Sequence, residues 1–156
     1  MGRFFDAASS MIGLRHTATY EGQAAIELED IADPAEPGAY GFDTQGGVMD
    51  PAPLWQALLA DWRAGVSLPI LAARVHNSVV NLAVEICLEV RRLHSANIVA
   101  LSGGVWQNMF LLSHTVPALE SAGFRVLIHH KVPANDGGLA LGQALIAGWA
   151  ARQGKL

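Results

Sequence analysis

One pattern that occurs twice most restricts how the second half of this chain can fold: a short β-branched strand, a glycine-rich loop and a helix. The first copy comprises a strand at 97–101, the loop Ser102-Gly103-Gly104 and a helix over about 106–121. The second comprises a strand at 124–129, a loop at 133–138 and a helix over about 138–152. Short strands alternating with helices predict an α/β layer with parallel pairing. Ligands of such sheets lie beyond the carboxyl ends of the strands, where both loops fall.

The first half of the chain predicts mainly helices. Apolar periodicity and stop signals place them at about 2–13, 22–32, 51–64 and 67–94. Asp50 is expected as the N-cap of the third of these, with Pro51 at the first helical position. Residues 39–49 predict two short strands around a Gln45-Gly46-Gly47 turn.

Composition limits the class of protein. Of 156 residues, 51% are hydrophobic and 15% are charged, with a net charge of −4, which suits one domain with a sizeable core. No basic stripe is present, so nucleic-acid binding is not expected. No uninterrupted apolar run of about 18 residues occurs, so no membrane span is expected. The single cysteine, Cys87, can form no internal disulfide, which is compatible with a reducing cytoplasm.

The first glycine loop is a candidate ligand site. Gly103 and Gly104 let the backbone approach a ligand closely and open a helix, and Asn108 is expected about one turn into that helix. The loop is neither a Walker A motif nor a dinucleotide G-x-G-x-x-G. Taken alone, it either binds a phosphate or nucleoside or merely turns the chain.

Two carboxylates also allow two interpretations each. Asp136, in the second loop, is either a helix cap or one oxygen ligand of a cation. Asp6, early in the first helix, either complements the helix dipole or accepts hydrogen bonds from two ribose hydroxyls.

The histidines predict no self-contained metal site. Six are present, but no H-x-x-x-H or H-E-x-x-H pair occurs. His76 lies mid-helix among apolar residues and is expected to be a core histidine rather than a catalytic one. Neither a Ser/His/Asp arrangement nor a nucleophilic cysteine is visible, so no catalytic residue is assigned.

Together these segments resemble one family, the hydrogenase-maturation carbamoyltransferases (the HypF family). The resemblance runs from residue 2 to about 147. It is carried by G-R-F-F-D-A at 2–7, Y-E-G-Q-A-A at 20–25, R-V-H-N at 74–77, S-G-G-V-W-Q-N at 102–108, and P-A-N-D-G-G at 133–138 followed by L-G-Q-A at 141–144.

The resemblance implies the C-terminal lobe, over residues 1–156, of a carbamoyltransferase (Kae-like, TsaD-like) domain. Its expected fold is one lobe of an actin/Hsp70/sugar-kinase (ribonuclease H-like) α/β fold, with helices packed on a small mixed sheet. Because the family's H-x-x-x-H motif and first phosphate loop lie upstream, the chain is expected to be truncated or split, and weakly active or inactive alone.

The implied activity uses carbamoyl phosphate and ATP. A carbamoyl-adenylate forms, and the carbamoyl group passes to the C-terminal cysteine of a HypE-like partner in [NiFe]-hydrogenase maturation, in the cytoplasm. The upstream half of the family protein is the second expected partner. By analogy the nucleotide-binding residues are Asp6, Gly22, Gln23, Gly103, Gly104 and Asn108, and Asp136 is a ligand of a divalent metal (Zn, Fe or Mg).

Two other functions stay open. One is a relative of the transferases that make threonylcarbamoyladenosine on tRNA, although the Y-E-G-Q-A-A segment argues against it because those relatives carry Y-P-G-G-P there. The other is a non-catalytic fragment that only binds a nucleotide or a partner. In the tRNA-modifying relatives the metal Asp precedes an Asn, whereas here Asn135 precedes Asp136, so the register of that ligand is open by one position.

Overall fold

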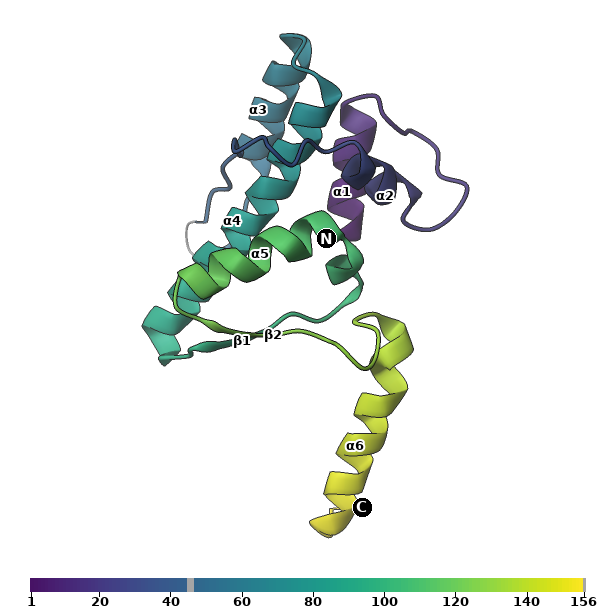
Figure 1. Cartoon of the computed structure of the whole chain (residues 1–156), viewed down its shortest axis with the longest axis vertical. Helices are drawn as coiled ribbons and strands as arrows, with labels where there is room; N and C mark the ends of the chain where they lie inside the picture. Colours follow the sequence, from purple (N-terminus) through teal and green to yellow (C-terminus); the bar gives the residue numbers. More distant parts are fainter. Residues whose placement is uncertain (45–46, 156) are drawn as a thin grey trace.

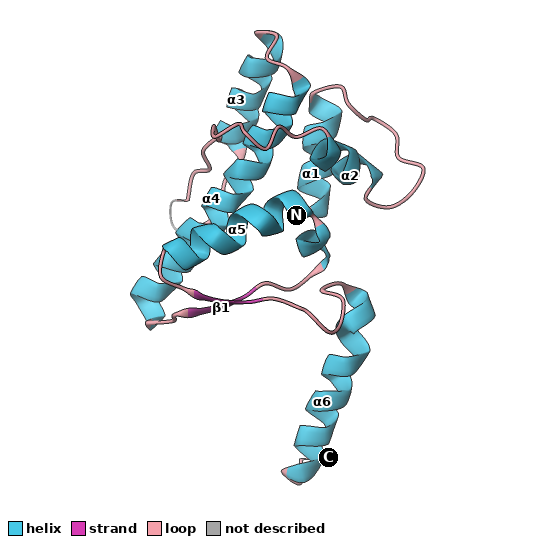
Figure 2. Ribbon diagram, viewed as in Figure 1, coloured by secondary structure: helices cyan, strands magenta, loops and turns pink. Residues whose placement is uncertain are grey.

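This computed structural model describes residues 1–44 and 47–155 of the chain. These residues contain six α-helices and a two-stranded sheet (Figure 1). The elements are α1 (Gly2–Met11), α2 (Gln23–Asp30), α3 (Ala52–Arg63), α4 (Leu68–His94), β1 (Ile98–Ala100), η2 (Gly104–Gln107), α5 (Met109–Ser121), β2 (Arg125–Leu127), η3 (Asp136–Gly138) and α6 (Leu139–Arg152). Figure 2 shows the helices gathered above the short strands, with α6 standing apart.

Helix α4 is the centre of the main core. Its first half buries Leu71, Val75 and Val79 against α1, α2, α3 and α5, because their spacing places them on one helical face. By length and composition alone α4 is apolar enough to cross a membrane, but half of its most apolar window is buried in the protein. The core helix of a soluble protein meets the same criterion, so this is weak support for a membrane span.

The sheet is parallel. Ile98 pairs with Arg125 and Ala100 with Leu127, and α5 makes the crossover between the two strands. Leu119 of α5 packs on Leu101 and Phe124 to cover one face of the sheet. The expectation of a mixed sheet is therefore wrong for the described residues, where both strands of the sheet run the same way.

In the region expected to hold two strands near residue 45, the described residues form one antiparallel bridge, between Asp43 and Asp50. Gln45 and Gly46 of the expected turn lie outside the described residues. The expected cap of α3 is also shifted: Pro51 takes the N-cap position, and the Asp50 carboxylate accepts a hydrogen bond from the Ala52 N–H at 2.9 Å.

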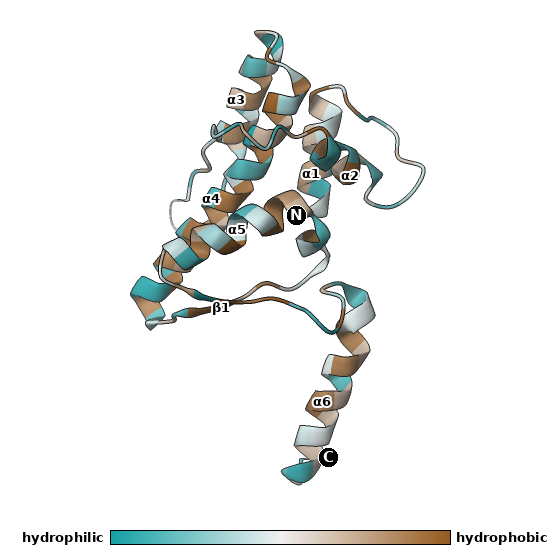
Figure 3. Cartoon of the chain, in the orientation of Figure 1, coloured by the Kyte–Doolittle hydropathy of each residue, from teal (hydrophilic) through white to brown (hydrophobic). Residues whose placement is uncertain are grey.

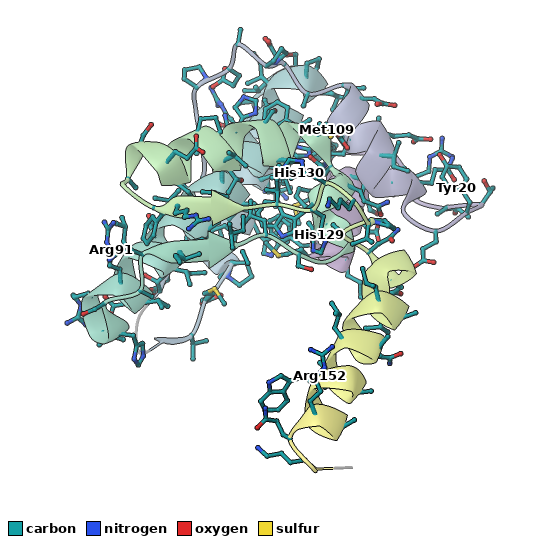
Figure 4. All side chains as sticks on the ribbon, turned by 60° about the horizontal axis from the view of Figure 1, so that its bottom comes forward. Tyr20, Arg91, Met109, His129, His130 and Arg152 are labelled. Atoms are coloured by element: carbon teal, nitrogen blue, oxygen red, sulfur yellow. The ribbon has the colours of Figure 1, made fainter. Side chains whose placement is uncertain are left out.

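Helix α6 extends away from the rest of the molecule, and its ribbon is coloured largely as hydrophobic (Figure 3). It buries no residue, and Leu145, Ile146 and Trp149 are 66%, 69% and 57% exposed. Figure 4 shows Arg152 near its far end, remote from the other labelled residues. On the sheet, Ile98 and Leu127 are also exposed. We call these residues of α6 and the sheet, together with Leu139 and Leu141, the open apolar surface.

Candidate functional site

A cleft of about 1120 Å³ lies between α1, α2 and the two glycine loops. Small-molecule sites usually measure about 300–1,000 Å³, so this one is large enough for a nucleotide. Its walls come from four separated parts of the sequence: Met1, Gly2, Arg3, Phe5, Asp6, Glu21, Gly22, Ala25, Ile26, Glu29, Gly104, Val105, Gln107, Asn108, Asn135 and Asp136.

Most of the residues singled out from the sequence line this cleft. Asp6, Gly22, Gly104, Asn108 and Asp136 all do so, although they come from four segments. The β1–α5–β2 crossover brings the two loops to the same end of the sheet, and packing of α1 on α2 adds the remaining wall.

Gln23 does not line the cleft. Its side chain is buried, accepts hydrogen bonds from the Thr19 N–H at 2.8 Å and hydroxyl at 3.1 Å, and donates to Glu27 at 2.9 Å. Glu27 in turn accepts from Arg15 at 2.6 Å, and that bond lowers the pKa of the Glu27 carboxyl. Gln23 therefore holds the turn before α2, and the neighbouring Gly22 faces the cleft.

Gly103 joins the two loops. Its N–H donates to the Ala134 carbonyl at 2.8 Å, and its φ of +103° lies in the region that favours glycine. Gly103 does not line the cleft, whereas the neighbouring Gly104 does. A side chain at Gly104 would only reach ordinary contact, 3.9 Å, with Asn135.

The charged side chains of the cleft are mainly acidic. Asp6, Glu21, Glu29 and Asp136 line it, and Arg3 is its one guanidinium. Carboxylates accept hydrogen bonds and donate none when ionised, so this wall suits hydroxyl and amino groups. It disfavours a bare phosphate, which would need cations from elsewhere.

The N-terminus of α5 is fully capped by side chains. Glu29 accepts from the N–H groups of Met109 at 2.6 Å and Phe110 at 3.2 Å, and Asn108 accepts from Leu111 at 2.7 Å. The first N–H groups of α5 are therefore already bonded to these carboxylate and amide oxygens and are not available to a ligand.

Asn108 is the N-cap of α5 and does not lie one turn inside it, because η2 intervenes between Gly103 and the helix. Its Nδ2 lies 3.0 Å from Nε2 of His76. His76 is fully buried between the rings of Phe5 and Phe110, at centroid distances of 4.8 and 5.0 Å. Burial lowers its pKa to about 4, so the expected core histidine is confirmed and its ring is neutral.

Asp136 caps neither η3 nor α6, whose N-cap is Gly138. Asn135 is the N-cap of η3, and its Oδ1 accepts from the Gly137 N–H at 3.0 Å. Among the described residues no group of three histidine, cysteine or acidic side chains could hold a metal ion.

Sequence reasoning missed Arg3, Glu21, Glu29 and Gln107, which also line the cleft. Three of them had a visible signal, since Arg3 is inside the G-R-F-F-D-A segment, Glu21 inside Y-E-G-Q-A-A and Gln107 inside S-G-G-V-W-Q-N. Glu29 had none, because its role depends on how α2 packs near the start of α5.

Comparison with known proteins identifies the family of these segments. The family described as "Carbamoyltransferase, Kae1-like Domain, second subdomain" matches residues 1–143. Carbamoyltransferase HypF of Synechocystis sp. is 37% identical over 93% of this chain, and that of Rhodobacter capsulatus is 41% identical over 94%. The chain covers 19% of the length of each of these two relatives.

Solved structures agree with this. The crystal structure of full-length HypF in the phosphate- and nucleotide-bound form superposes with a TM-score of 0.87 and 41% identity, covering 94% of this chain and 20% of the other. HypF of T. kodakarensis superposes with a TM-score of 0.85 over 98% of this chain and 20% of the other; at 24% identity this likeness shows the fold alone.

Proposed function

Because this chain belongs to the HypF carbamoyltransferase family, we propose that it is the nucleoside-holding lobe of a carbamoyltransferase that works with the remainder of the family protein. The observation that carries the proposal is the cleft, in which Asp6, Gly22, Gly104, Asn108 and Asp136 converge from four segments. A relative with 41% identity has been solved with a nucleotide bound.

The proposed architecture is the C-terminal lobe of an actin/Hsp70/sugar-kinase domain over residues 1–156. The parallel β1–α5–β2 unit and the loops at the strand ends are compatible with it. In this arrangement the nucleotide lies between two lobes, which agrees with a cleft larger than a nucleoside needs.

The acidic wall suggests which part of ATP this lobe takes. Asp6 accepts from the ribose hydroxyls, Gly104 lets the nucleoside approach the backbone, and Asn108 contributes its amide. The phosphates point away from Asp6, Glu21 and Glu29, toward Asp136 and cations that the other lobe supplies. Asp136 adds one oxygen to a divalent metal whose remaining ligands lie outside this chain.

The proposed reaction is the family's transfer of a carbamoyl group. In the cytoplasm, the C-terminal cysteine of a HypE-like partner loses its thiol proton to solvent, and the resulting thiolate attacks the carbamoyl carbon of the carbamoyl-adenylate. A carbon–sulfur bond forms, the bond from that carbon to the phosphate oxygen breaks, and AMP leaves. The contribution of this lobe is to hold the adenosine so that the reacting carbon is fixed in place.

The open apolar surface is where we propose that the upstream part packs. A parallel sheet is normally covered on both faces, whereas here Ile98 and Leu127 are exposed. Large apolar patches on a protein mark interaction sites. This chain corresponds to only 19% of the length of its relatives, so a covering subdomain of the same protein is available.

Two other functions are distinguished by assay. A threonylcarbamoyl transferase acting on tRNA is disfavoured by Y-E-G-Q-A-A and by the match to carbamoyltransferases. A fragment that only binds a nucleotide or a partner would share the cleft but transfer nothing.

The direct test is reassembly. The chain is mixed with Rhodobacter capsulatus HypF that lacks the matching segment, and carbamoyl transfer from carbamoyl phosphate to a HypE acceptor is measured with ATP. Transfer in the mixture but in neither part alone is the expected result. A complex that forms and transfers nothing would favour the non-catalytic fragment.

Substitutions in the cleft test the nucleotide site. In the reassembled protein, Asp6→Ala and Asn108→Ala should each weaken ATP binding by about 1–3 kcal/mol, since each removes hydrogen bonds to the nucleoside. Isothermal titration measures the loss. Asp30→Ala is the matched control, because it removes an exposed carboxylate of α2 that does not line the cleft. Unchanged ATP affinity in both variants would remove these residues from the site.

A further inference from the structure

His76 and Asn108 form a pair whose hydrogen-bond roles follow from chemistry alone. Nδ1 of His76 lies 2.8 Å from the Ala72 carbonyl, which can only accept, so Nδ1 carries the proton. The buried ring is neutral, which leaves Nε2 as an acceptor. It therefore accepts a hydrogen bond from Nδ2 of Asn108 at 3.0 Å.

The contact of the Asn108 amide oxygen supports the same assignment independently. The Leu111 N–H can only donate, and it lies 2.7 Å from Oδ1 of Asn108. Both contacts therefore select the same orientation of the Asn108 amide, with oxygen toward α5 and nitrogen toward His76. An amide nitrogen has two N–H groups, so one remains after the bond to His76.

The ring of His76 is fixed in place by two aromatic contacts. Phe5 stacks on it at 4.8 Å with an interplanar angle of 27°, and Phe110 packs on it at 5.0 Å. Phe5 and Asn108 both line the cleft, whereas His76 does not. His76 thus touches two walls of the cleft from behind, and it touches no ligand itself.

We propose that His76 is a positioning residue, which fixes the Asn108 amide so that its remaining N–H is offered to an acceptor atom of a bound nucleoside. This inference rests on the proposed function and deepens it. The preferred ligand presents a ring nitrogen or a ribose oxygen to Asn108, and a group with only donors at that place is disfavoured.

The test uses the chain reassembled with the remainder of the family protein, with adenosine as the probe because it carries no phosphate. His76→Phe keeps the ring stacking and removes the acceptor of Asn108, so the dissociation constant for adenosine should rise about threefold to tenfold. His76→Gln returns an amide oxygen that can accept and should recover part of the loss. In an Asn108→Ala background, His76→Phe should cause no further change.

His114→Phe is the matched control. Like His76, His114 packs on Phe110, with ring centroids 4.2 Å apart. Its Nδ1 lies 2.7 Å from the carbonyl oxygen of the residue four positions earlier, an arrangement that His76 shares. The amide of Asn108, however, contacts the ring of His76. Its substitution should leave adenosine affinity unchanged. A purely structural role for His76 would instead give losses that add to those of Asn108→Ala.

Nitrogen NMR of the unsubstituted chain tests the geometry without any variant. The expected signature is an unprotonated Nε2 of His76, coupled through the hydrogen bond to Nδ2 of Asn108. A proton on Nε2 would overturn the inference. Equal adenosine affinity of His76→Phe and the unsubstituted chain would overturn it too, while leaving the proposed function standing. No effect of Asn108→Ala, or no adenosine binding at all, would overturn both.

Discussion

At the scale of residues, the cleft is shaped by side chains that satisfy one another before any ligand arrives. Glu29 and Asn108 occupy the N–H groups of α5, and Asn108 also contacts His76. Paired groups of this kind keep fixed orientations, because an unmade hydrogen bond in a buried place is costly. We therefore expect the back wall of the cleft to change little when a nucleoside binds.

The pKa of His76 gives the first prediction at this scale. Burial lowers it from 6.5 to about 4, so between these values the unfolded chain binds a proton that the folded chain does not. Above pH 6.5 the free energy of unfolding should not depend on this residue. As the pH decreases through this range the free energy of unfolding should fall, and below pH 4 the loss should reach about 3 kcal/mol. Urea unfolding across this range, compared with His76→Phe, isolates the contribution; two parallel curves would contradict it.

At the scale of elements, the second glycine loop is fixed by a close approach of backbone to backbone. A Cβ at Gly138 would lie 2.5 Å from the Pro133 carbonyl oxygen, closer than such atoms can approach. The loop that carries Asn135 and Asp136 to the cleft thus depends on glycine at its end. A Cβ at Gly142, one turn later in α6, would meet nothing within 4 Å.

The same substitution at these two glycines should therefore have opposite effects. Gly138→Ala should displace the loop and lower the free energy of protection of the α6 amides against hydrogen exchange by about 1–3 kcal/mol. Gly142→Ala should instead stabilise the helix by up to about 1 kcal/mol. Hydrogen exchange of the amides of residues 139–152 measures both changes. Equal protection in the two variants would show that the Pro133 contact does not hold the loop.

At the scale of the whole molecule, the main core and the open apolar surface have separate purposes. Leu54, Leu58 and Leu71 are completely buried in the core, whereas α6 buries nothing. The stability of the isolated chain should therefore come from α1 to α5, and the surface of α6 should matter for association only.

Ile146→Glu tests this separation. Because Ile146 is 69% exposed, the free energy of unfolding of the isolated chain should change by less than about 0.5 kcal/mol. Association with the upstream part should be lost, as followed by size-exclusion chromatography of the mixture. Val48→Glu, at a residue 68% exposed before α3, is the control and should leave association intact. Normal association of Ile146→Glu would show that α6 is not the docking surface.

Much of the fold followed from the sequence because its signals are local. The predicted helices and the two strands of the parallel pair all occur with small shifts at their ends, since apolar periodicity, prolines and glycines act within a few residues. The strand–loop–helix repeat also placed both glycine loops at one end of that pair. Of the two strands expected near residue 45, the described residues form one bridge, because strand pairing depends on a partner that local sequence does not specify.

The sequence by itself determined the elements, the family and the chemical groups available for a site. Only the tertiary structure decided which groups meet: Glu29 rather than a ligand caps α5, Asn135 rather than Asp136 caps η3, and Gln23 turns inward. Contacts between residues as far apart as Glu29 and Met109 depend on how helices pack, and packing is set by the shapes of all the buried side chains together.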